Sequence, residues 1–355
     1  MRNLLFLMAM LFWSFYNSPN IFAQDIHFSS IHASPVHLNP AMTGMFNGGN
    51  TRFIGISRSQ WNTFTNGFKT ISGSIDTKLL HAGSDAFFGG GLQLFTDKAG
   101  DLDFKSTFVG GSMSFVKGLS RKSNNYIALG VQAAYYGNSF DQTKMVGFDE
   151  ETSILFGDVA SNINYFDLSV GVGWYYTFND DNYYYLGASM FHINTPNVSF
   201  FDTFNSNQSQ ANLPGHNLFR KLTIHGGANL RMADNITIQP SFIFFDQGPH
   251  REINAGSYFK IQKQKRHRRQ TQEYAFYFGA WVRFYQEANY SGIDAVIPSI
   301  RADFNNTTIS LSFDVNISDL RVVSAGAGGP ELSVIKVLGS SNPSRKKSRV
   351  KCPGF

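Results

Sequence analysis

Hydrophobic and polar residues alternate with a period of two along most of the chain. In residues 166–178 (FDLSVGVGWYYTF), Leu168 and Val170 fall on one face and Ser169 falls on the other. Residues 307–317 (TTISLSFDVNI) repeat the pattern. Because successive side chains of a strand point to opposite faces, each segment is predicted to be a strand with one apolar and one polar face.

About fourteen such segments follow one another, and no linker separates them into domains. Many reach the ~10 residues that a tilted strand needs to cross a membrane. The pattern predicts an all-β fold, a single transmembrane antiparallel β-barrel of about 14 strands. A soluble β-sandwich is the alternative, but sandwiches rarely alternate so regularly over such long strands. The predicted strands lie near 51–60, 68–79, 86–98, 103–117, 125–136, 163–178, 183–193, 218–230, 235–246, 251–261, 273–285, 292–303, 306–317 and 328–338.

The gaps between these strands differ in length in a regular way. Two odd-numbered gaps, 137–162 and 194–217, are long, whereas several even-numbered gaps are short turns such as NDDN (179–182). Long loops outside and short turns inside are typical of outer-membrane barrels, so the even-numbered turns are predicted to face the periplasm. The rings that crowd NDDN, in GWYYTFNDDNYYYLGA (173–188), are then expected at the membrane–water boundary.

The composition supports a membrane barrel. Charged residues make up 15% of the 355 residues, below the ~25% of soluble proteins, and aromatic residues also reach 15%. The single Cys352 excludes an internal disulfide framework and a site of several thiolates, and no cofactor is predicted. Asp149–Glu151 is predicted to be a solvated loop, so no pair of carboxylates is set up for catalysis and the protein is not expected to be an enzyme.

The two ends of the chain differ from its middle. Residues 1–23 combine Arg2 with a short apolar run and a small residue at Ala23, which predicts a signal peptide with a mature start near Gln24. The predicted organisation continues with a periplasmic N-terminal segment (24–50), the outer-membrane barrel (51–339) and a basic periplasmic tail (340–355).

Several stretches, taken in order, resemble the PorP/SprF family of type IX secretion system outer-membrane proteins. The first is QDIHFSSIHASPVHLNPAMTG (24–44), followed by SRSQWNTFTNGFKTISGSIDTKL (57–79). MVGFDEETSILF, YYLGASMFHINTP, GIDAVIP, FDVNISDL with GGPELSV, and KCPGF extend the resemblance over nearly the whole mature chain. The positions that carry the family motif are Asn39, Pro40, Ala41, Gly44, Gln60 and Trp61.

The resemblance implies a Bacteroidota outer-membrane barrel that supports the secretion or surface anchoring of a client protein, for example a gliding adhesin. It also implies contact with a periplasmic peptidoglycan-binding component of the secretion machine. Outer-membrane lipid is the third expected partner. A channel or transporter for solutes or hydrophobic compounds is the alternative function, although the predicted lumen faces hold mainly Ser, Thr, Gly and Asn and show no ring of charge.

Two basic runs are the candidate partner-docking sites, since both are predicted to face the periplasm. Charge would steer an acidic periplasmic partner to them. Anchoring near lipid headgroups, or a solvated tail, is an equally weighted interpretation. Nucleic acid is not expected as a partner in this compartment. The basic residues are Lys263, Lys265, Arg266, Arg268, Arg269, Arg345, Lys346, Lys347, Arg349 and Lys351.

Overall fold

The computed structural model contains fourteen strands and a few short helical turns. Among the residues it describes, no helix is long and apolar enough to cross a membrane. The described residues are 25, 28–30, 33–60, 67–82, 85–120, 124–144, 160–179, 181–200, 217–267, 270–287, 290–318, 321 and 326–339.

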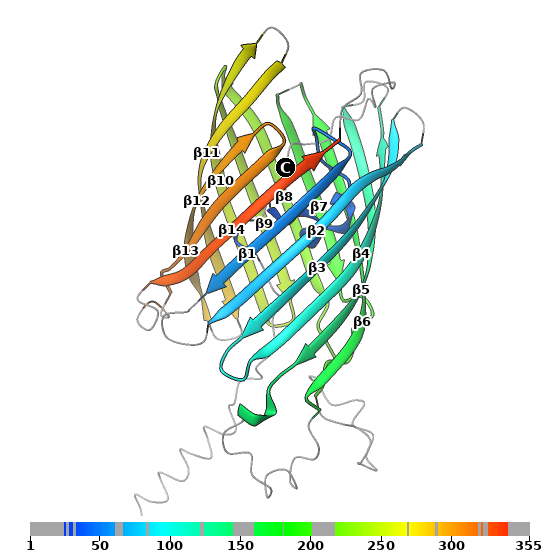
Figure 1. Cartoon of the computed structure of the whole chain (residues 1–355), viewed down its shortest axis with the longest axis vertical. Coiled ribbons are helices and arrows are strands. Elements are labelled where there is room, and N and C mark those ends of the chain that lie inside the picture. Colours follow the sequence, from blue (N-terminus) through cyan, green and yellow to red (C-terminus); the bar gives the residue numbers. More distant parts are fainter. Residues whose placement is uncertain are drawn as a thin grey trace, which may run out of the picture.

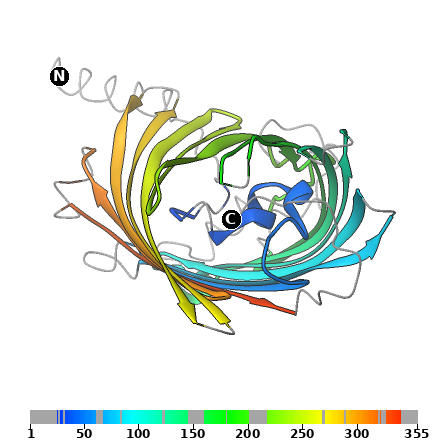
Figure 2. The same ribbon diagram turned by 90° about the horizontal axis from the view of Figure 1, so that it is seen from above.

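The strands form one closed antiparallel barrel (Figures 1 and 2), which confirms the predicted fold class. Each strand pairs with its neighbours in sequence, and β1 closes the barrel by pairing with β14. Closure leaves no free sheet edge, as a membrane requires. The strands are β1 (Thr51–Gln60), β2 (Phe68–His81), β3 (Ala86–Ala99), β4 (Phe104–Gly118), β5 (Asn125–Ser139), β6 (Asn162–Thr177), β7 (Tyr183–Phe191), β8 (Lys221–Ala233), β9 (Ile236–Gln247), β10 (His250–His267), β11 (Gln270–Glu287), β12 (Tyr290–Phe304), β13 (Thr307–Asn316) and β14 (Ala327–Leu338).

The outer face of the barrel is apolar, and the predicted register is confirmed. Val170 and Ile309 each expose 43% of their surface, whereas Ser169 and Ser310 expose 1% and 5%. Neighbouring positions therefore face opposite sides of the wall. This outward band of Leu, Ile, Val and Phe side chains suits the hydrocarbon core of a bilayer.

The two ends of the barrel differ. The even-numbered connections, such as β8–β9 and β12–β13, are short turns at the upper end in Figure 1. The strands flanking the two longest connections, β5–β6 and β7–β8, meet at the other end. We call these the short-turn end and the long-connection end. The contrast in length matches the sequence prediction.

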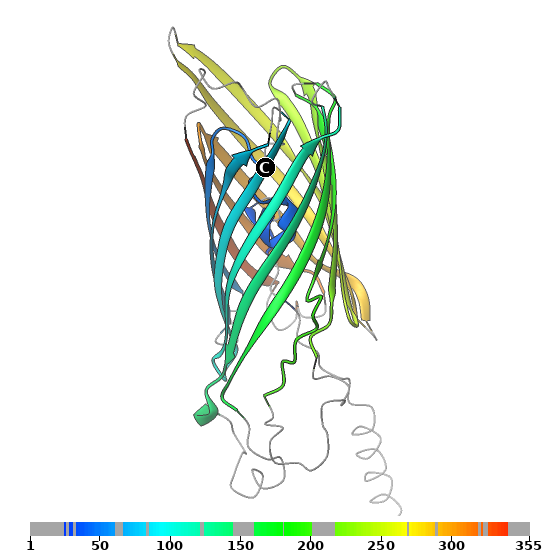
Figure 3. The ribbon, with the colours of Figure 1, turned by 90° about the vertical axis from the view of Figure 1, so that its right-hand side faces the viewer.

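Residues 262–267 lie between two predicted strands, but the structure includes them in β10, which corrects the predicted bounds. Strand β10 continues to His267 and pairs with β11 as far as Gln270. The backbone pairing continues through Lys263–Lys265 and Gln272–Tyr274, since a β-ladder joins backbone N–H and C=O groups whatever the side chains are. The hairpin projects from the short-turn end (Figures 1 and 3).

The aromatic residues around the β6–β7 turn are divided between two environments. Trp174 and Phe178 lie on the outer face, as the boundary prediction requires. Tyr175 and Tyr185 point into the lumen instead and are almost fully buried. The alternation of strand side chains makes this division unavoidable, and the lumenal rings pack against a segment inside the barrel, described next.

Candidate functional site in the barrel lumen

Residues 25, 28–30 and 33–50 run through the inside of the barrel, and we call them the lumenal segment. They include the short helix α2 (Pro35–Leu38) and the 3-10 turn η2 (Pro40–Met42), which lie within the ring of strands in Figures 2 and 3. The stretch was expected in the periplasm. It lies in the lumen instead because its apolar side chains are buried against the inward faces of the strands.

Asn39 fixes the middle of the lumenal segment to the wall. Its side-chain nitrogen donates hydrogen bonds to the carbonyl oxygens of Val172 (3.0 Å) and Ala188 (3.2 Å), and lies 3.1 Å from His225 Nε2. Its side-chain oxygen accepts from the Ala41 N–H at 2.9 Å, which caps η2. One amide thus joins three strands and begins the helical turn.

A row of small residues receives this part of the segment. Gly89, Ser114, Gly130, Gly171 and Ser189 stand opposite one another across β3 to β7. A Cβ at any of the three glycines would clash with the segment: with the carbonyl of residue 43, with the backbone of residues 40 and 41, and with the side-chain oxygen of residue 39. The two serine hydroxyls donate to backbone carbonyls of the segment at 2.6 and 2.8 Å. The wall is therefore shaped to admit the segment's backbone closely.

Gly44 ends this close contact and is held by a buried ion pair. It has a φ of +74°, which favours glycine, and its N–H donates to Asp76 Oδ2 at 2.7 Å. Arg52 binds the same carboxylate with two hydrogen bonds, at 2.9 and 2.8 Å. This bidentate geometry suits a buried pair. The pair therefore joins the exit of the segment to β1 and β2.

A larger charged network holds the beginning of the segment. The Ser29 and Ser30 N–H groups donate to the two oxygens of Glu331 at 2.8 and 2.7 Å, and the Ser29 hydroxyl donates to Asp314 at 2.6 Å. Arg58 and Arg283 approach the second oxygen of Asp314 at 2.9 and 3.0 Å. Backbone N–H groups and guanidinium groups therefore share the same buried carboxylates, which satisfies charges that burial would otherwise make costly.

This network corrects the prediction of a lumen with few charges. The sequence does contain an indication of lumenal charge, because Arg52 and Arg58 both occupy the inward face of β1, six residues apart. The same face also carries Ile54 and Ile56, which pack against Phe28 of the segment. The inward face of β1 thus carries both apolar and charged side chains.

The first described residue of the lumenal segment, Asp25, lies at the long-connection end. Its carboxylate is 2.7 Å from His192 Nε2 and 3.5 Å from Lys221 Nζ, while His192 Nδ1 is 2.9 Å from Asp167. Burial opposes charge on both Asp25 and His192. The attraction of His192 and Lys221 nevertheless lowers the pKa of Asp25 well below its ordinary value. The negative charge of Asp25 and the hydrogen bond to Asp167 raise the pKa of His192 to about 9.

Comparison with known families covers nearly the whole chain. The family described as "Type IX secretion system membrane protein PorP/SprF" matches residues 20–334. The chain belongs to the PorP/SprF family. The expected resemblance is thereby confirmed, and with it a β-barrel of the type IX secretion system in the outer membrane. No curated protein matches the chain.

Several solved structures of outer-membrane proteins are similar to this PorP/SprF barrel at low sequence identity. The Pseudomonas putida toluene transporter TodX has 9% identity and a TM-score of 0.46, with 89% of this chain and 98% of that chain covered. The CymD monoaromatic hydrocarbon channel has 11% identity and a TM-score of 0.44, with coverages of 87% and 93%. BamA from Haemophilus ducreyi has 10% identity and a TM-score of 0.42, with coverages of 82% and 70%.

The structure brings together four of the six family-motif positions. Asn39, Pro40, Ala41 and Gly44 are fully or almost fully buried in the lumen. Gln60 is the last residue of β1, at the long-connection end. Of the remaining predicted residues, Trp61, Arg268, Arg269, Arg345, Lys346, Lys347, Arg349 and Lys351 lie outside the described residues, and Lys263, Lys265 and Arg266 lie in the projecting part of β10.

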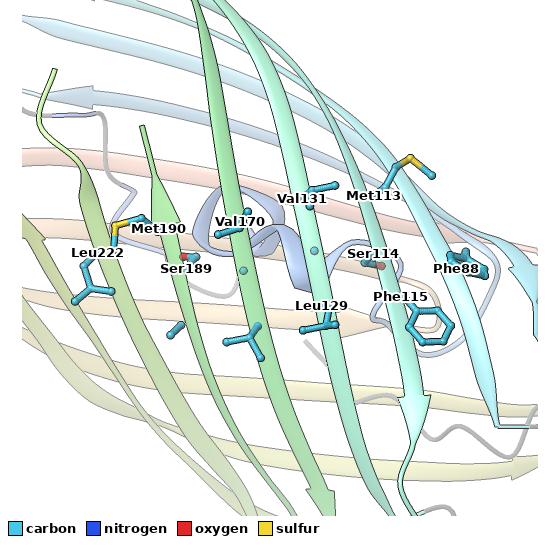
Figure 4. A pocket seen from close by; sticks show the side chains of 14 residues that line it. Phe88, Met113, Ser114, Phe115, Leu129, Val131, Val170, Ser189, Met190 and Leu222 are labelled. Carbon is cyan, nitrogen blue, oxygen red and sulfur yellow. The ribbon is translucent and has the colours of Figure 1, made fainter. Parts of the chain in front are cut away.

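Outside the wall, opposite the Asn39 anchor, the membrane-facing surface has a shallow groove of about 650 Å³. Figure 4 shows Leu129, Val131, Val170 and Leu222 among its lining, with the helical turn of the lumenal segment behind the strands. The groove is lined by Ser114, Gly130, Gly171 and Ser189 of the small-residue row and by larger outward side chains such as Phe88 and Phe115. Its apolar lining matches the hydrocarbon of the bilayer.

Proposed function

We propose that this protein is an outer-membrane component of the type IX secretion system that supports the secretion or surface anchoring of one client protein by binding partners. The family match over residues 20–334 carries the proposal. The lumenal segment supports binding rather than conduction, since the chain's own residues occupy the lumen and are held there by the anchors described above. A gliding adhesin is one kind of client that the family resemblance implies.

The two ends of the barrel would serve different partners. We infer that the long-connection end faces outside and meets the client, because long loops are external in outer-membrane barrels. The short-turn end would then carry the β10–β11 hairpin and residues 340–355 into the periplasm. Their basic residues would dock the periplasmic peptidoglycan-binding component through steering and charge pairing.

Cysteine labelling tests this orientation. After replacement of Cys352 by Ser, single cysteines at residues 147–155 or 203–212 should react with an impermeant reagent in whole cells. Cysteines at Asp180 or Arg266 should react only after the outer membrane is opened. The reverse pattern would invert the barrel and remove the argument for periplasmic docking.

Deletion of the protein tests the function itself. We expect one secreted protein to disappear from the cell surface, measured by surface proteomics, while general uptake of small solutes stays unchanged. Loss of uptake of a solute, with every surface protein still in place, would support the transporter alternative and refute this proposal. The purified wild-type barrel should also show little ion conductance in a planar bilayer.

Neutralising both basic runs tests the docking surface. Exposed charge pairs contribute only ~0–1 kcal/mol each, so single Lys→Gln changes should be nearly silent. The full set should weaken co-purification of the periplasmic partner and make the residual binding less sensitive to salt. The matched control neutralises Lys117 and Lys336, two lysines whose side chains lie on the outer wall. If the fully neutralised barrel assembles and captures its partner normally, the basic runs have no docking role.

A further inference from the structure

Three lysines form a ladder on the outer wall near the long-connection end. Lys69 of β2 stands directly opposite Lys98 of β3, and Lys98 stands directly opposite Lys105 of β4. All three side chains are exposed and point away from the lumen. Like charges directly opposite each other destabilise a sheet, so a row of three lysines is costly unless an anion neutralises it.

The nearby acidic residues neutralise only the middle lysine of the ladder. Asp103 pairs with Lys98 at 2.8 Å, and it also binds Lys144. Asp141 instead accepts hydrogen bonds from the backbone and hydroxyl of Thr143. Within the part of the chain that the structure describes, neither of the other two lysines of the ladder has an ion pair.

The ladder lies where the apolar belt of the barrel ends. On the same outward face, two residues along from Lys69, Ile71 exposes 60% of its surface, and Leu94 and Val109 continue the apolar surface away from the long-connection end. The lysines line a surface hollow of about 600 Å³ that also contains Thr96, Ser139, Phe140 and the two carboxylates of Asp103 and Asp141. The ladder and belt thus present positive charge directly beside a surface suited to hydrocarbon.

We propose that this lysine ladder binds the phosphate groups of a membrane lipid whose acyl chains lie along the apolar belt below it. Lys69, Lys98 and Lys105 would each offer an ammonium donor to phosphate oxygens, and Ile71, Leu94 and Val109 would contact the chains. A free anion would contact only the three lysines and not the apolar residues. With the orientation proposed above, the lipid is a phosphorylated glycolipid of the outer leaflet. Phosphate binding by the ladder does not depend on that orientation.

The test uses the full-length purified barrel in neutral detergent. A bis-phosphorylated glycolipid and the same glycolipid without its phosphates are titrated against the wild type, Lys69→Gln/Lys105→Gln and the matched control Lys117→Gln/Lys336→Gln. The control removes Lys117, which is half-exposed and pairs with Asp85, and the exposed Lys336, both from the short-turn end of the same outer face. Heat-dependent gel mobility confirms that each variant is folded.

We expect the Lys69→Gln/Lys105→Gln variant to bind the phosphorylated lipid about 30-fold more weakly, from about 1 kcal/mol for each lysine near an anionic surface. The control variant should bind like the wild type, and the dephosphorylated lipid should bind weakly to all three. Unchanged affinity in the Lys69→Gln/Lys105→Gln variant, or an equal loss in the control, would overturn the proposal. Displacement of the lipid by inorganic phosphate at comparable affinity would show a simple anion site and would equally refute it.

Discussion

The lumenal segment is held by two kinds of anchor, and they depend on different properties of the wall. Around Asn39 the contacts are neutral: one amide, backbone carbonyls, and glycines that allow close approach. Around Ser29 the contacts are ionic, with Glu331 and Asp314 held between arginines. The neutral anchor depends on shape, since a single methyl group would fill the space that the segment needs. The charged anchor depends on a balance of buried charges, because removal of one carboxylate leaves buried positive charge unpaired.

This difference predicts how each anchor fails. Loss of a charge at the Ser29 anchor should affect the whole barrel, since the network also joins β1, β11, β13 and β14. Damage at the Asn39 anchor should loosen the segment while the strands around it stay paired. The following predictions test that contrast.

The largest effect is expected from Asp314→Asn. The change leaves Arg58 and Arg283 without one of their carboxylate charges in a buried site, so the barrel should lose ~3–5 kcal/mol of stability. The measurement is the temperature at which the folded band is lost on a gel. Asp246→Asn is the control, because Asp246 pairs with Arg251 in an exposed position and should cost at most ~1 kcal/mol. Equal effects of the two changes would contradict the charged-anchor interpretation.

The second effect is a dependence on pH at the mouth of the lumen. The pKa of His192, raised to about 9, means that its stabilising contribution is complete below the ordinary value of 6.5 and is lost as pH rises through 9. The barrel should therefore lose up to about 3 kcal/mol between pH 6.5 and 9.5.

His192→Gln should abolish most of this dependence, whereas His81→Gln, at an exposed position near the short-turn end, should leave it intact. Thermal melts at several pH values measure both. A His192→Gln barrel with the wild-type pH profile would show that the Asp25–His192–Asp167 contacts do not hold the segment.

A smaller effect is expected from Gly171→Ala. The added methyl group would meet the side chain of Asn39 and should cost ~1–3 kcal/mol through overpacking. Gly111→Ala is the matched control: its added Cβ would meet only Leu92, at an ordinary 3.8 Å on the outer face. Comparable melting temperatures for the two variants would argue against close seating of the segment.

The smallest effect is expected from Asn39→Ala, about 1–2 kcal/mol for the lost hydrogen bonds. Asn306→Ala, which removes an exposed contact with the Gly48 carbonyl, should be nearly silent. Conductance sharpens the comparison of the anchors. Asp314→Asn should raise ion conductance of the purified barrel more than Asn39→Ala does, because the charged anchor holds the end of the segment. A larger conductance for Asn39→Ala would show that the Asn39 anchor, and not the charged anchor, contributes more to holding the segment in the lumen.

The hydrophobic pattern was enough to predict the barrel and the face on which each strand side chain lies. Alternation of apolar and polar residues sets which side of a strand meets lipid, so Val170 and Ile309 were correctly placed without any tertiary information. Most strand bounds followed from the same signal, within a few residues. The extension of β10 to His267 was missed because its polar residues carry no alternation, although the backbone pairs there.

The occupant of the lumen could not be predicted from the pattern, because it depends on contacts between distant parts of the chain. Residues 28–46 have no period that marks them as a barrel core, and their partners lie up to about 300 positions away, as the contact of Ser29 with Glu331 shows. The inward charges of Arg58, Asp314 and Glu331 look solvated along separate strands. They meet only when β1 pairs with β14 and closes the barrel. A linear pattern reports the face on which a side chain lies, whereas closure decides which side chains share that interior.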